Sequence, residues 1–130
     1  MRSLAREKVF EYIFSRLFNQ SDEGLFAVLK RDLKSEDDKA FADKLLAAVI
    51  SGEEKYSDKL SALSANFKLE RIFAADKCAI FIGMAELDAF SETPTAVVID
   101  EAVKLAAKYS TENSTGFVNG ILAEYAKDGK

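Results

Sequence analysis

Side chains that commonly carry out catalysis are scarce in this sequence of 130 residues. It contains no histidine, which is the commonest general acid/base and the commonest metal ligand. Cys78 is the only cysteine, so Cys/His zinc clusters and Cys–His or Ser–His nucleophile pairs are excluded. The six glycines are scattered singly and form no phosphate-binding loop. The sequence therefore indicates a binding protein rather than an enzyme, with no cofactor and no metal.

Glu86 is the one acid within a long apolar segment. No second acid/base partner is evident nearby, so we expect Glu86 to be a buried structural carboxylate whose charge is satisfied. Cys78 is expected to be a small core residue.

The cysteine count and the apolar runs indicate where the chain resides. A single cysteine allows no internal disulfide, which suits a reducing cytoplasm. The amino terminus is interrupted by charges and lacks the apolar run of a secretion signal. The longest apolar run, residues 78–85, is far shorter than the ~20 residues of a membrane span, so no membrane association is expected.

The overall charge argues against a general polyanion binder. There are 18 basic and 22 acidic side chains, which give a net charge of −4, whereas nucleic-acid-binding domains are usually basic. A local basic patch on one face stays possible.

Apolar residues recur at helical spacing throughout the chain, and alternation at period two is nearly absent. We predict one all-α domain over residues 1–130, with about seven helices joined by short connections. The first helix is expected over residues 3–18, with Phe10, Phe14 and Leu17 on one face. The third is expected to stop at Gly52. The fifth, over residues 69–90, is apolar on every side and therefore central, and Gly83 within it predicts a closely packed neighbour.

The dipeptide Asn119-Gly120 raises the alternative of a β-hairpin near the carboxyl terminus. Phe117, Ile121 and Tyr125 are spaced as on one helix face, and an isolated hairpin would be marginal in a helical protein. We therefore predict a final helix beginning at Ser114 or Thr115. Its Asn119 amide is free to bond to a neighbouring loop or to a ligand.

The carboxy-terminal half resembles the NusB family of bacterial transcription antitermination factors. The family pattern is matched by Glu86-Leu87, Pro94, Ile99, Glu101-Ala102 and the segment Phe-Val-Asn-Gly-Ile-Leu at residues 117–122. The opening residues 5–14 resemble the family's Ala-Arg-Glu helix. The resemblance covers the first helix and residues 68–126, and it is weak between residues 21 and 66.

The resemblance implies two small helical bundles packed together, in a monomer or a homodimer. It also implies that the chain pairs with NusE, a ribosomal small-subunit protein, and binds boxA-type single-stranded RNA of nascent ribosomal RNA transcripts within an RNA polymerase antitermination complex. Two alternatives stay open. One is a protein-only interaction module of the same fold with little RNA affinity, and the other is a detached RNA-binding domain of a ribosomal RNA cytosine methyltransferase system.

The resemblance assigns RNA contacts to two segments. One is the amino-terminal helix, where Arg2 and Arg6 share a face and Lys8 lies nearby, a thinner basic run than the family has. The other is the last loop and helix, with Asn113, Ser114, Phe117 and Asn119. The alternatives are that Arg2 and Arg6 are solvated helix-end charges and that Phe117 is a core residue.

NusE contacts are assigned by position to Phe14, Glu70 and Asp76. NusE is basic, so the two carboxylates would steer it. The alternative is that Phe14 is buried and that both acids complement the dipole at a helix amino terminus.

Overall fold

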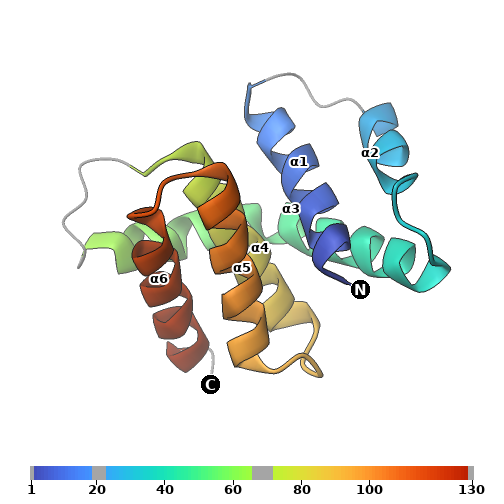
Figure 1. Cartoon of the computed structure of the whole chain (residues 1–130). Helices are drawn as coiled ribbons and strands as arrows, with labels where there is room; N and C mark the ends of the chain where they lie inside the picture. The colour runs from blue at the N-terminus through green and yellow to red at the C-terminus, as the bar shows by residue number, and fades with distance from the viewer. Residues whose placement is uncertain (1, 19–22, 66–71, 129–130) are drawn as a thin grey trace.

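A computed structural model describes residues 2–18, 23–65 and 72–128 (Figure 1). These ranges contain six α-helices and no strand, which confirms the all-α prediction and brings the number of helices to six. The helices are α1 (Arg2–Phe18), α2 (Glu23–Lys30), α3 (Glu36–Ser64), α4 (Ala74–Ala89), α5 (Thr95–Tyr109) and α6 (Ser114–Asp128).

The predicted third and fourth helices are one continuous helix, α3. It begins after Ser35, whose side chain accepts a hydrogen bond from the Asp38 N–H at 3.0 Å. The prediction that Gly52 stops the helix is wrong. A Cβ at Gly52 would lie 2.4 Å from the ring of Tyr56. The lack of a side chain at Gly52 therefore leaves room for this ring to pack along the same helix.

The helices form two packed bundles, as expected. Helix α1 packs against α2 and α3 to form one bundle, while α4, α5 and α6 pack against one another and contact α3 through α4 and α6 (Figure 1). Helix α1 also contacts α4 and α5, so it lies on the seam between the bundles. The long helix α3 therefore serves both bundles.

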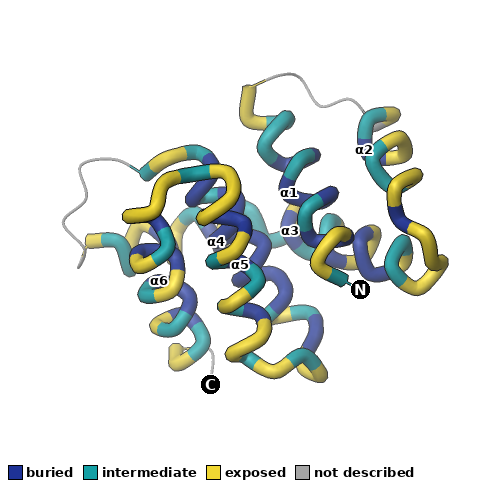
Figure 2. Tube along the Cα trace, viewed as in Figure 1, coloured by how far each residue is buried: buried dark blue, intermediate teal, exposed yellow. Residues whose placement is uncertain are grey.

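Helix α4 is the centre of the fold, as its apolar sequence predicts. Its residues from Cys78 to Glu86 are all buried, and the trace of α4 is mostly dark blue in Figure 2. The predicted close neighbour at Gly83 is α6. A Cβ on Gly83 would lie 2.6 Å from a methyl group of Leu122.

The segment around Asn119-Gly120 is helical, which confirms the prediction against a hairpin. Helix α6 runs through both residues without interruption. Its inner face consists of Phe117, Val118, Ile121, Leu122 and Tyr125. None of the described helices combines the length and the apolar character that crossing a membrane requires.

Candidate functional site

Arg6 lies in a buried ion cluster at the seam between the bundles. Its guanidinium donates two hydrogen bonds to the carboxylate of Glu86, at 2.7 and 2.6 Å, and one to Glu101, at 3.1 Å. Arg6 is 5% exposed and Glu86 is 1% exposed. The paired, fork-like geometry joins α1 to α4 and α5.

The surroundings of Arg6 keep its charge. Burial alone would lower the pKa of Arg6, but the hydrogen bonds and charges of Glu86 and Glu101 outweigh burial and raise it. Glu86 is therefore the satisfied structural carboxylate that was expected. The assignment of Arg6 to RNA needs correction, because its guanidinium is buried and three of its five N–H groups are already bonded to carboxylates.

Lys8 is likewise engaged within the protein. Its Nζ lies 2.8 Å from the carboxylate of Asp32 and 3.3 Å from that of Glu11. The hydrogen bond to Asp32, against the opposing effect of burial, raises the pKa of Lys8. Lys8 therefore ties α1 to the turn between α2 and α3, and the structure does not present it as a phosphate contact.

Arg2 is the one amino-terminal cation of the three predicted that stays accessible. It is half-buried, and its guanidinium stacks 4.5 Å from the ring centroid of Phe41. No carboxylate pairs with it among the described residues. Its charge is therefore available to an anionic ligand.

The second segment assigned to RNA is divided between surface and core. Asn113 and Asn119 are exposed, while Ser114 and Phe117 are 4% and 8% exposed. Phe117 is a core residue and has no free face on which a base could stack, so its assignment to RNA needs correction. Asn119 borders a shallow groove along α5 that is lined by Ala96, Ile99, Asp100 and Val103.

Ser114 supports the fold rather than a ligand. Its hydroxyl donates a hydrogen bond to Asp76 at 2.9 Å and also lies 3.0 Å from the hydroxyl of Thr111. This contact fastens the start of α6 to the first turn of α4. Ser114 is therefore not presented to RNA.

Helix α1 contacts α5 at two levels. Ser3 and Arg6 bond to Glu101, while Glu7 accepts hydrogen bonds from Lys108 and Tyr109 at the end of α5, next to the last loop. The amino-terminal helix thus reaches the end of α5 through an acidic residue rather than through one of the three predicted cations.

Of the three residues assigned to NusE, the structure describes Phe14 and Asp76. Phe14 is half-buried, with its ring stacked on Phe10 at a centroid distance of 5.9 Å and tilted against Phe18 at 5.0 Å. Asp76 is 3% exposed beneath Ser114, in the first turn of α4, where a carboxylate complements the helix dipole. Asp76 is therefore not a surface carboxylate. Glu70 lies outside the described residues.

An exposed apolar surface at the end of α1 went unrecognised in the sequence. Leu17 and Phe18 are 44% and 65% exposed. Beside them is a cleft of about 120 Å³ between α1, α3 and α4, lined by Ile13, Arg16, Leu17, Glu53, Ser57, Lys77, Cys78 and Phe81. The sequence carries a signal for this surface. Phe10, Phe14 and Phe18 recur every four residues, so one face of the helix stays aromatic beyond Ile13, its last buried residue.

The described residues contain no group of three or more His, Cys, Asp or Glu side chains able to hold a metal ion. Cys78 is buried, as expected, and burial raises the pKa of its thiol to about 12. A thiol with that pKa stays protonated at neutral pH and is a poor nucleophile.

The NusB family model matches residues 3–127 of the chain. This chain belongs to the NusB family. The NusB transcription antitermination protein of Dictyoglomus turgidum is 33% identical over 127 residues, which cover 98% of this chain and 85% of the relative. That of Pseudothermotoga lettingae is 35% identical over 127 residues, with 97% and 91% covered.

Solved NusB structures have the same fold. T. maritima NusB superimposes with a TM-score of 0.87 at 27% identity, over 98% of this chain and 92% of the other. A structure of the antitermination factors NusB and NusE in complex with dsRNA superimposes with a TM-score of 0.83 at 25% identity, over 98% and 96% of the two chains.

Proposed function

We propose that this NusB family member is a transcription antitermination factor that pairs with NusE and binds boxA-type RNA of nascent ribosomal RNA transcripts. One observation carries the proposal. The chain superimposes along 98% of its length on a solved structure whose complex contains NusB, NusE and dsRNA. In this proposal the protein acts in the cytoplasm as a single adaptor domain that catalyses no reaction.

The protein partner is assigned to the α1 apolar edge, which we define as Phe14, Leu17 and Phe18. Leu17 and Phe18 leave much of their apolar surface in water, which is typical of a surface that a partner covers. The ring of Phe18 packs against that of Phe14 in a tilted arrangement, which helps to hold the edge in shape before binding. The adjoining cleft offers a partner side chain a place between α1, α3 and α4.

A pull-down with NusE tests the partner assignment. Phe18→Ala combined with Leu17→Ala should weaken NusE binding at least tenfold, because both side chains are exposed and their loss removes contact area without opening the core. Val28→Ala combined with Val97→Ala is the matched control, since these exposed apolar residues lie on α2 and α5. Equal NusE binding by both double variants would refute the assignment to the α1 apolar edge.

The RNA assignment is tested by titrating boxA RNA against salt, with and without NusE. Binding to single-stranded boxA should weaken as salt rises, and NusE should strengthen it. A duplex of the same sequence belongs in the experiment, because the related complex contains dsRNA. A preference for the duplex would contradict the single-stranded assignment.

A protein-only interaction module is the second candidate function, and one observation favours it. The cations Arg6 and Lys8 are both bound to carboxylates, so fewer positive charges of α1 are available to RNA than its sequence suggests. In that case NusE would bind normally while boxA RNA failed to bind at 50 mM salt, with or without NusE. The salt titration and the pull-down together separate the two functions.

A further inference from the structure

The seam between the bundles carries a second accessible cation, Lys44, close to Arg2. The rings of Phe41 and Phe90 pack against each other with centroids 4.7 Å apart. The Arg2 guanidinium lies 4.5 Å from the Phe41 centroid, and the Lys44 Nζ lies 4.5 Å from the Phe90 centroid. This pair of rings thus carries two accessible cations, and the buried Arg6 guanidinium also lies 5.2 Å from the Phe41 centroid.

Both cations lie on rings that the core holds in place. Phe41 and Phe90 are 3% and 4% exposed, so the rings form a rigid base, while Arg2 is half-buried and Lys44 is exposed. Neither Arg2 nor Lys44 has a carboxylate partner among the described residues. Most other described cations differ in this respect, because Arg6, Lys8, Arg16, Lys30, Lys39, Lys55, Lys104 and Lys108 all form ion pairs.

We propose that Arg2 and Lys44, mounted on the Phe41–Phe90 ring pair, form a phosphate-binding track for single-stranded RNA across the seam between the bundles. This inference rests on the proposed function and adds to it a contact residue outside the amino-terminal helix. The three distances above join end to end, so the two cations lie no more than about 14 Å apart. A stacked strand that rises ~3.4 Å per nucleotide spans that distance in about four nucleotides.

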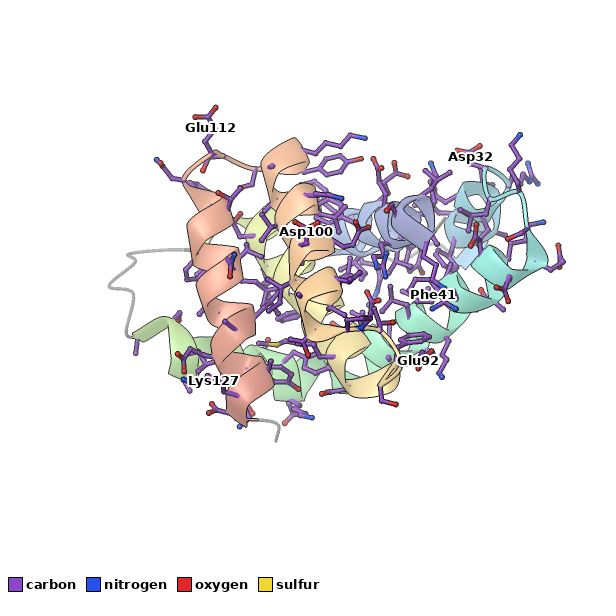
Figure 3. The ribbon with its side chains drawn as sticks, turned by 60° about the horizontal axis from the view of Figure 1, so that its bottom comes forward. Asp32, Phe41, Glu92, Asp100, Glu112 and Lys127 are labelled. Atoms are coloured by element: carbon purple, nitrogen blue, oxygen red, sulfur yellow. The ribbon has the colours of Figure 1, made fainter. Side chains whose placement is uncertain are left out.

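Two acids near the track, Asp43 and Glu92, differ in their expected effect on phosphate binding. Asp43, the neighbour of Lys44 in sequence, is paired with Lys30 at 2.6 Å, so its charge is offset. Glu92 is exposed in the turn that follows Phe90 and lies toward the same end of the molecule as Phe41 in Figure 3. Its carboxylate would repel a phosphate on the track. Glu92→Gln should therefore strengthen RNA binding.

The test compares variants that each lack one positive charge. It measures how strongly salt weakens boxA RNA binding by each variant in the presence of NusE. Lys44→Gln and Arg2→Gln should each reduce the slope of log affinity against log salt by about 0.7, the value for one single-strand phosphate contact. Lys127→Gln is the control, because this substitution removes the same charge at an exposed position on α6 that lies far from Phe41 in Figure 3. Lys44→Arg should retain the wild-type slope.

The outcomes separate this inference from the proposed function. If wild-type protein binds RNA and Lys44→Gln has the same slope as Lys127→Gln, the track is refuted while the antitermination role stands. If wild-type protein with NusE binds no RNA, the RNA role fails and the track fails with it. Thermal unfolding and the NusE pull-down should be unchanged in Lys44→Gln, because an exposed lysine supports little of the core.

Discussion

At the scale of single residues, the amino-terminal cations look alike in sequence and differ sharply in space. Arg2, Arg6 and Lys8 lie within seven residues, yet only Arg2 remains accessible. The difference follows from partners that are distant in the sequence. Glu86, Glu101 and Asp32 are contributed by α4, α5 and the α2–α3 turn, and no local pattern places them beside α1.

Breaking the buried pair should destabilise the protein strongly. Arg6→Ala leaves the carboxylate of Glu86 uncompensated in the core, which costs about 3–5 kcal/mol of unfolding free energy. Urea denaturation measures the loss. Arg16→Ala removes a more exposed ion pair with Glu53 and should cost at most about 1 kcal/mol. Similar losses in the two variants would show that the buried pair contributes no more than a surface one.

The ion cluster of Arg6, Glu86 and Glu101 should make the free energy of unfolding depend on pH. Burial would raise the pKa of Glu101, but hydrogen bonds from Ser3 and Lys104 and the charge of Arg6 lower it overall. A carboxyl group with a lowered folded-state pKa adds stability above its unfolded pKa and loses it as the pH falls through the folded value. The free energy of unfolding should therefore fall as the pH drops below about 4.5. In Glu101→Gln that fall should be shallower, and an identical pH profile would contradict the assignment.

At the scale of elements, the helices were predictable wherever a single segment carries its own signal. The all-round apolar character of α4 and the spacing of Phe117, Ile121 and Tyr125 in α6 are local, and both predictions are confirmed. The prediction for Gly52 is wrong because a glycine can either end a helix or make room for a ring packed against that helix. The position of the Tyr56 ring decides between these two roles, and tertiary packing rather than local sequence sets that position. For the same reason, the partners of Arg6 could not be predicted.

The contact between α4 and α6 gives a prediction for Gly83. Gly83→Ala would gain about 1 kcal/mol of helix propensity but would force the fully buried side chain of Leu122 to shift within the core, at a cost of about 1–3 kcal/mol. The net result should be destabilisation. In a Leu122→Ala background the same substitution should become neutral or stabilising, and thermal unfolding of the four proteins measures this coupling.

Gly116 provides the control for this coupling. It lies in α6 with open space where a Cβ would project, so Gly116→Ala should raise the unfolding free energy by about 0.5–1 kcal/mol. A gain in Gly83→Ala equal to that in Gly116→Ala would refute the close approach of α6 to α4.

At the scale of the whole molecule, the account assigns two ligands to different places on the two packed bundles. The α1 apolar edge lies at the carboxyl end of α1, and Arg2 with Lys44 lies near its amino end. Because Arg2 and Phe18 are the first and last residues of the 17-residue helix α1, a rise of about 24 Å separates them along the helix. NusE and RNA can therefore be bound at the same time without competing for the same side chains.

The most direct measurement of this central claim is the mass of the assembly in solution. The protein, NusE and a boxA RNA oligonucleotide are mixed in equal amounts and separated by size-exclusion chromatography with light scattering. The account predicts one species whose mass equals one copy of each component, together with a tighter RNA complex than the protein forms alone. Elution of NusE and RNA in separate, mutually exclusive complexes with the protein would contradict it.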